Sequence, residues 1–187
     1  TKSENFENNI VNESYKEINA FSLAVENNNI EIIKLLLKNN KIDVNNKIVI
    51  GKIEYDSERI YGSDHRYEEE MTSLYLAISK RNYEIVKLLL ENDKIDVNAL
   101  YKSEDIKENL KNDITQTGLI KAIINKDLEM IKLLLSDNKI NVNIPYKSDI
   151  SETNIPDTLK NNKCKYEYKK IISFLLLLLM KFEIYNF

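Results

Sequence analysis

Turn-forming and reactive residues are scarce in this chain of 187 residues, which has three glycines, two prolines, one cysteine, one histidine and no tryptophan. So little glycine and proline argues against a turn-rich β fold. Three glycines also leave no glycine-rich loop that could cradle a phosphate. Cys164 cannot form a disulfide within the chain, which indicates a reducing compartment.

Side chains for metal binding and catalysis are equally few. A zinc site needs several histidines or cysteines at ligand spacing, whereas His65 and Cys164 each stand alone. A serine or cysteine nucleophile would have only His65 as its base. The acidic run Glu68–Glu70 is typical of solvated carboxylates rather than of an acid/base pair. We therefore predict a protein that is not an enzyme and that holds no metal and no cofactor.

The charge balance and the apolar runs limit the partners. With 27 basic and 30 acidic residues the net charge is −3, so there is no general basic face for nucleic acid. The longest apolar run, Ile171–Met180, is about half of the ~20 residues that span a bilayer. We expect neither a nucleic-acid partner nor a membrane span. The polar opening Thr1–Asn5 lacks a signal peptide, and we expect a cytoplasmic protein.

The chain is organised around one phrase that occurs three times, and the middle copy, Ser73–Asn98, reads SLYLAISKRNYEIVKLLLENDKIDVN. In every copy a fixed alanine lies eleven residues before the first leucine of the Leu-Leu-Leu run. The pairs are Ala24 and Leu35, Ala77 and Leu88, and Ala122 and Leu133. Self-similarity at fixed spacing is typical of a repeat array.

The second half of each copy predicts a helix with an apolar arc of roughly 200°, too wide for one neighbour to cover. Asn29, Asn82 and Asp127 are suited to cap these helices at the N-terminus. Glu31, Glu84 and Glu129 follow in the first turn, where the helix dipole favours negative charge. The pairs Asn39-Asn40, Asn92-Asp93 and Asp137-Asn138 are expected to close the helices in the left-handed conformation.

The first half of each copy predicts a shorter helix, with Asn19, Thr72 and Thr117 as N-caps. Leu74, Ala77 and Ile78 fall on one face of the middle copy by the three-and-four spacing. The alanine at one fixed position indicates a close approach between helices. Two such helices cannot bury these faces alone, so the copies are expected to stack into one spine through Leu35, Leu88 and Leu133.

This unit resembles an ankyrin repeat. Thr72-Ser-Leu-Tyr-Leu-Ala77 is similar to that family's opening T-P-L-H-x-A, and the second helix and the closing Asp96-Val-Asn98 match as well. The sequence departs from the pattern at the proline, at the histidine, which is Ser22, Tyr75 or Ile120, and at the glycine between the helices. That glycine is Asn28, Arg81 or Lys126, and the last two would be strained at positive φ.

The resemblance implies an all-α fold, an ankyrin-type helix-pair solenoid with extended finger loops, forming a single domain over residues 1–187. Repeats are expected at 19–45, 72–98 and 117–143, with inserts at 46–71 and 99–116 in the finger-loop position. A degenerate C-terminal unit is expected at about 158–187, with Phe174–Leu176 in place of the three leucines.

The segments between the repeats allow several interpretations. Residues 1–18 fit either an N-terminal helix or a frayed tail. The first insert could form a hairpin bent at Gly51, and in the second Ser103 could cap a short helix with Ile106 and Leu110 facing inward. The last apolar helix is either buried by its neighbours or exposed for self-association.

The resemblance further implies a protein–protein interaction scaffold without catalytic activity. The alternative is a self-associating or regulatory domain cut from a larger multidomain protein. The matching surface lies at the ends of the first helices, just before each repeat opening, and in the fingers. Its residues are Glu26, Asn27, Ser79, Lys80, Ile124, Asn125, Met71, Gln116, Glu68, Glu69 and Asp113. Arg59, Tyr61, Arg66 and Tyr67 are added because tyrosine and arginine are enriched at binding hot spots; alternatively, these aromatics fold the insert over its own stack.

Overall fold

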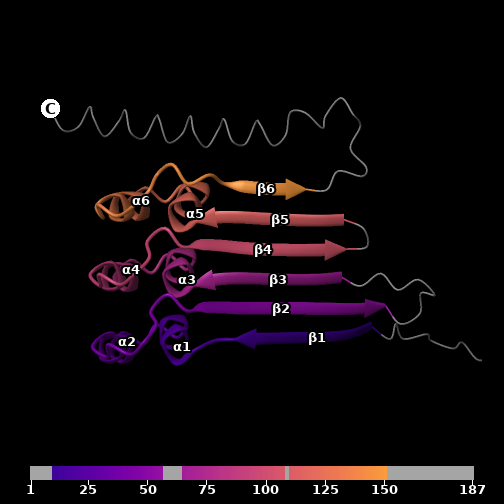
Figure 1. The fold of residues 1–187 in the computed structure, drawn as a ribbon, viewed down its shortest axis with the longest axis horizontal. Helices are drawn as coiled ribbons and strands as arrows, with labels where there is room; N and C mark the ends of the chain where they lie inside the picture. The colour runs from indigo at the N-terminus through magenta and orange to yellow at the C-terminus, as the bar shows by residue number, and fades with distance from the viewer. Residues whose placement is uncertain (1–9, 57–64, 108–109, 151–187) are drawn as a thin grey trace, which may run out of the picture.

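A computed structural model describes residues 10–56, 65–107 and 110–150 of the chain, in which three similar units stack side by side (Figure 1). Each unit runs strand, helix, helix, strand. The first comprises β1 (Ile10–Glu17), α1 (Ala20–Glu26), α2 (Ile30–Leu37) and β2 (Lys47–Asp56). The second comprises β3 (His65–Thr72), α3 (Ser73–Ser79), α4 (Tyr83–Leu90) and β4 (Leu100–Lys107). The third comprises β5 (Leu110–Thr117), α5 (Gly118–Ile124), α6 (Leu128–Leu135) and β6 (Lys147–Ile150).

The helix starts are confirmed in all three units. The side chains of Asn19, Thr72 and Thr117 each accept a hydrogen bond from a backbone N–H three residues on, at Ser22, Tyr75 and Ile120. Asn29, Asn82 and Asp127 do the same for the second helices. Each cap satisfies one of the N–H groups that a helix leaves without an internal partner.

The left-handed residues lie between the helices, not after them. Asn28, Arg81 and Lys126 have φ of 55°, 56° and 55°. The prediction that the Asn and Asp pairs after the second helix take this conformation is wrong, since these are the positive-φ non-glycine residues of the described chain. The second helices instead end at Lys38, Glu91 and Ser136 in right-handed geometry.

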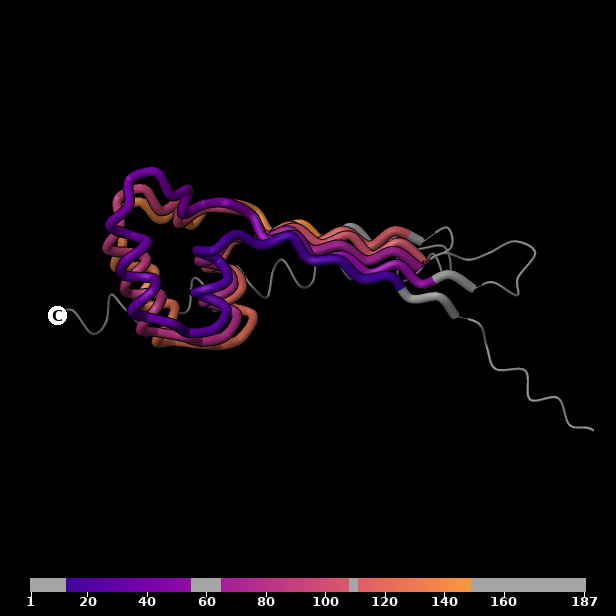
Figure 2. Tube along the Cα trace, turned by 90° about the horizontal axis from the view of Figure 1, so that it is seen from below, coloured from indigo at the N-terminus to yellow at the C-terminus, as the bar shows by residue number. Residues whose placement is uncertain are grey.

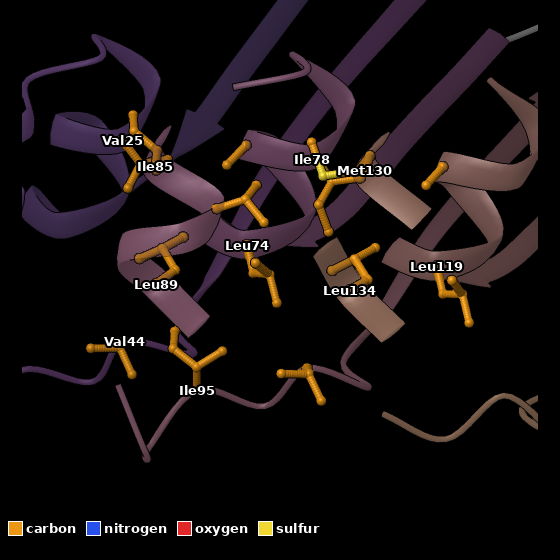
Figure 3. Packing of buried hydrophobic residues seen from close by; sticks show 14 of the residues in the cluster. Val25, Val44, Leu74, Ile78, Ile85, Leu89, Ile95, Leu119, Met130 and Leu134 are labelled. Carbon is orange, nitrogen blue, oxygen red and sulfur yellow. The ribbon is translucent and has the colours of Figure 1, made fainter. Parts of the chain in front are cut away.

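The predicted stacking produces one continuous apolar core. Its buried members come from all six helices and from the turns that follow the second helices, such as Val44 and Ile95 (Figure 3). Leu88 and Leu133 are packed against this core, but Leu35 is 66% exposed. The expected spine through Leu35 is therefore wrong at its first member, because no preceding unit covers that face of α2 in the described chain.

The all-α expectation is wrong. The inserts and the flanking segments form an antiparallel sheet of six strands in the order β1-β2-β3-β4-β5-β6. Outgoing and returning strands of neighbouring units pair with one another, so the fingers join into a single layer (Figure 1). Each strand finds the partners for its backbone groups in other parts of the chain, and a single sequence segment does not reveal such pairing.

Three local predictions are also wrong. They concern the N-terminal segment, the bend at Gly51 and the helix after Ser103. Residues Ile10–Glu17 form β1 rather than a helix or a frayed tail. Gly51 lies inside β2, opposite Tyr15 and Glu68, and not at a bend. Ser103 lies within β4, so the short capped helix is absent there. The expected C-terminal unit at 158–187 lies outside the described residues.

The sheet projects away from the helices, as Figure 2 shows. One of its faces and the first helices of the units (α1, α3 and α5) form two sides of an open angle. A second apolar cluster fills the base of this angle, where Ile48, Met71 and Tyr101 of the sheet meet Tyr75 of α3. No described helix has the length and hydropathy that a membrane span requires.

Candidate functional site

The two faces of the sheet follow from register and alternation, because successive side chains of a strand point to opposite faces. Met71 packs with Tyr75 of α3, and Glu69 and Tyr67 are two and four residues before it on β3. These residues define the inner face, which lines the angle. Glu68 and Arg66 alternate with them and lie on the outer face. Gly51 is opposite Glu68 and Tyr15 is opposite Gly51, so both lie on this face as well.

A cluster of three tyrosines and one carboxylate occupies the inner face. The rings of Tyr75 and Tyr101 stack with centroids 4.5 Å apart and planes 8° from parallel. The Tyr101 hydroxyl donates a hydrogen bond to Glu69 Oε1 at 3.0 Å, and the Tyr67 hydroxyl donates to the same oxygen. Gln116 Nε2 donates to the Tyr75 hydroxyl at 2.7 Å. The cluster therefore connects β3, β4 and β5 to α3.

Burial controls the protonation of this cluster. Loss of solvent is the main cause that raises the pKa of Tyr75, Tyr101 and Tyr67 above the ordinary 10.0. Glu69 accepts hydrogen bonds from neutral hydroxyls, and its charge further disfavours a second negative charge nearby. The tyrosines are therefore hydrogen-bond donors at neutral pH.

The single histidine joins three strands farther along the inner face. His65 Nε2 lies 2.7 Å from Asp105 Oδ1 of β4, and His65 Nδ1 lies 3.4 Å from Glu54 Oε2 of β2. Lys52 forms an ion pair with Glu54 at 2.5 Å and, with His65, lowers the pKa of that carboxyl. Within the described ranges, no group of three or more His, Cys, Asp and Glu side chains could hold a metal ion.

The ends of the first helices form the other side of the angle. Lys16, on the inner face of β1, pairs with Glu26 at the end of α1 at 2.5 Å. Ser79 and Ile124 are the seventh residues of α3 and α5, as Glu26 is of α1, so the three positions form a column facing the angle. Ile124 is 44% exposed there. Lys80 Nζ and Arg81 Nη2 donate to the Glu26 and Asn125 carbonyls, which ties adjacent units together.

The charges that β2 to β5 carry on the outer face are paired with one another. Glu70 accepts from Lys47 and lies 4.0 Å from Lys102 Nζ. Glu68 accepts from the Tyr15 hydroxyl and from Arg66 at 3.1 Å. Lys111 lies 3.1 Å from Asp113 and 3.7 Å from Glu104.

The predicted surface residues are therefore not all brought together. Glu26, Ser79, Ile124, Tyr67 and Glu69 line the angle. Lys80, Asn27 and Asn125 lie beside them at the helix ends.

The other predicted residues lie elsewhere. Arg66, Glu68 and Asp113 are on the outer face, and Met71 and Gln116 are buried in the second apolar cluster or beside it. Arg59 and Tyr61 lie outside the described residues.

Several residues of the angle were missed from sequence, above all Tyr75, Tyr101, Asp105 and Glu54. A bend at Gly51 and a short helix after Ser103 were expected in the inserts, and these expectations hid the two-residue alternation along the strands. Tyr101, Ser103 and Asp105 share the inner face of β4 in this way.

Comparison with family models decides the relationship. The model described as "Ankyrin repeats (3 copies)" matches residues 3–101, which is more than half of the chain. The chain belongs to the ankyrin-repeat family. A second model, "Ankyrin repeats (many copies)", matches residues 73–135. Curated proteins and solved structures gave no match.

Membership confirms the resemblance that the repeated phrase indicated. Ankyrin repeats are generally protein–protein interaction modules, and families built from them are typically non-catalytic. In this ankyrin-repeat chain the helices follow the expected pattern, and the finger loops are strands of one sheet.

Proposed function

We propose that this ankyrin-repeat chain is a protein-interaction scaffold without catalytic activity, and that its partner lies in the angle between the inner face of the sheet and the ends of α1, α3 and α5. The observation that carries the proposal is the pair of surfaces that meet in this angle. The helix side exposes Ile124, and the sheet side holds the half-buried Tyr67 and Glu69 beside the stacked rings of Tyr75 and Tyr101.

The base of the angle is buried and hydrogen-bonded, which favours binding. Tyr75 and Tyr101 are buried, stacked and hydrogen-bonded, so the half-buried Tyr67 and Glu69 are held in place before a partner arrives. Pre-organised side chains lose little conformational freedom on binding. Tyrosine is also among the residues that dominate interface energetics.

The chemistry of the angle suggests what the partner offers. Ile124 provides an apolar contact on the helix side. Glu69 and Asp105 provide carboxylates on the sheet side, which favour donors or cations and form the stronger, charge-assisted hydrogen bonds. We therefore expect a partner segment that places an apolar side chain beside a basic or amide-bearing one.

The test is a cross-linking pull-down of the full chain with matched variants. Ile124→Arg in the angle is expected to reduce recovery of the partner at least about tenfold, the size of an interface hot spot. Ile32→Arg is the control, because Ile32 is equally exposed at 44% but lies on α2. Equal recovery with wild type and both variants would place the partner elsewhere.

The alternative of a self-associating domain stays a prediction, since the apolar run Ile171–Met180 that would carry it lies outside the described residues. Sedimentation of the full chain at rising concentration tests it. A constant monomer mass would remove this alternative.

A further inference from the structure

The third unit leaves uncovered a position that the first two units bury. Val44, Val97 and Val142 occupy the same place in the closing turn of each unit. Val44 is 4% exposed and Val97 is 3% exposed, because the following unit lies against each of them, whereas Val142 is 40% exposed. In the described chain, no following unit packs against this valine of the third unit.

The closing turns of the first two units are also joined to the next turn by hydrogen bonds from one asparagine side chain. Asn45 Nδ2 donates to the Lys94 carbonyl at 2.7 Å, and its Oδ1 accepts from the Asp96 N–H at 2.9 Å. Asn98 repeats both bonds to Lys139 and Asn141 at 2.8 and 2.7 Å.

Asn143 is the third residue of this series. Its backbone N–H donates a hydrogen bond to Asn141 Oδ1, just as the N–H of Asn98 donates to Asp96 Oδ1. The turn is therefore formed in the same way, but no next turn receives the Asn143 side chain among the described residues.

The strand and the second helix of the third unit also lack a following unit among the described residues. β2 and β4 leave their units and pair with the returning strands β3 and β5, whereas β6 is the last strand in the described sheet order. Tyr83 of α4 reaches the next unit and donates to Asp127 at 2.8 Å. Leu128 holds the equivalent position in α6 and is 44% exposed. Leu128, Val142, Asn143 and β6, the last strand of the described sheet, make up what we call the C-terminal face.

We propose that residues 151–187 of this chain cover the C-terminal face as a fourth, repeat-like unit. The returning strand and helix pair of the second unit, His65–Leu90, take 26 residues, and 187 − 150 leaves 37 residues for the same task. The segment contains the apolar run Ile171–Met180, which needs a surface to bury it. The proposal extends the scaffold and does not depend on where its partner binds.

Thr158 sets the register of the proposed unit, whose first helix is degenerate because Lys160 and Lys163 fall where Leu74 and Ala77 are buried in the second unit. Counted from Thr72 and Thr117, Thr158 places Cys164 where Ile78 and Ile123 stand, both of which are buried. The same count places Ile172 at the position of Val86 and Ile131, which are buried as well. Cys164 is the single cysteine, so its thiol reports on this site alone.

The first experiment compares Asn143→Ala with Asn98→Ala in the full chain, by urea unfolding. Asn98→Ala removes two bonds that the structure shows, and it sets the size of the loss. If residues 151–187 dock as proposed, Asn143→Ala shifts the urea midpoint by a similar amount. A midpoint equal to that of wild type would overturn the proposal. A shift that depends on protein concentration would overturn it too, because a second copy would then be the cover.

The second experiment measures how fast Cys164 reacts with a thiol reagent. We expect labelling at least about tenfold slower in the native full chain than in urea, as local opening must precede it. Val142→Asp should restore fast labelling, whereas Leu35→Asp, on the opposite end of the stack, should not. Native labelling as fast as in urea, or no effect of Val142→Asp, would contradict the docking.

Discussion

At the scale of single residues, the sheet depends on a contact between a glycine and an aromatic ring. Tyr15 of β1 lies across Gly51 of β2 and donates its hydroxyl hydrogen to Glu68 of β3. A Cβ atom at Gly51 would overlap the Tyr15 ring. Glycine in a strand normally weakens it and marks a close approach of this kind.

Gly51→Ala should therefore displace the exposed Tyr15 ring and destabilise the protein by about 1 kcal/mol, since the hydrogen bond to Glu68 is lost. Chemical unfolding measures the loss, and Gly51→Ala in a Tyr15→Ala background is the control. Removal of the ring opens the space, so the second cost should be much smaller. Equal costs in the two backgrounds would show that the ring does not cause the strain.

The tyrosines of the inner face predict a loss of stability at high pH. A pKa raised in the folded state means that the folded chain holds its protons more tightly than the unfolded chain. The contribution of Tyr75 and Tyr101 is thus full below pH 10, their ordinary pKa, and is lost as the pH rises above it. Unfolding as a function of pH, followed by tyrosinate absorbance, measures this.

Tyr101→Phe tests the assignment. The variant should lose about 1 kcal/mol at neutral pH with the hydrogen bond to Glu69, and its stability should fall less steeply above pH 10. Tyr146→Phe, outside the cluster, serves as the comparison. A Tyr101→Phe variant with an unchanged alkaline slope would assign the effect to other groups.

At the scale of elements, the helices were predictable, whereas of the strands only the extended backbone around Gly51 was expected. Caps such as Asn82 and the arc of Ile85, Val86 and Leu89 are encoded within a dozen residues, because helix contacts are local. The strands pair over longer distances, and their charged residues alternate between faces. Glu68–Glu70 was interpreted as one solvated run, whereas Glu69 binds two tyrosines on one face and Glu68 and Glu70 pair with cations on the other.

For the same reason the candidate site was only partly predictable. The helix column of Glu26, Ser79 and Ile124 follows from repeat position alone. Choosing between Tyr67 and Arg66 requires the strand register, which no single segment reveals. Ser103–Lys111 shows how a false helix arises, since Ser103, Ile106 and Leu110 satisfy helical spacing while the chain forms β4 and β5.

Ala77 tests the packing between elements. It is buried in α3, where α1 and α5 approach from both sides, and a larger side chain has no free space. Ala77→Leu should destabilise by about 1–3 kcal/mol, as measured by thermal unfolding. Ala20→Leu, at the exposed start of α1, should change stability by less than about 0.5 kcal/mol. Equal effects at the two positions would contradict close helix packing at Ala77.

At the scale of the whole molecule, stability is shared among units and is greatest in the middle. The second unit has a neighbour on both sides, and Ile85, Val86 and Leu89 of α4 are fully buried. Among the described residues α2 has a neighbour on one side only, and Ile33 alone of its residues is buried. In such an array each unit gains from every interface that it forms.

Backbone amides of α4 should therefore exchange hydrogen at least about tenfold more slowly than those of α2. Exchange followed by nuclear magnetic resonance at a fixed protein concentration measures this. Equal protection in the two helices would mean that another surface covers Ile32 and Leu35. Repetition at several concentrations then shows whether that surface belongs to a second molecule.

The way in which the fingers differ in length has a practical consequence. β4 and β5 pair as far as Lys107 and Leu110, so only two residues connect them, whereas eight residues lie between Asp56 at the end of β2 and His65 at the start of β3. The longer finger therefore gains its extra residues beyond the paired rows. A fluorescent or affinity label built into the chain between Asp56 and His65 would leave every row of the sheet in register, and the scaffold could be followed in solution without altering the angle.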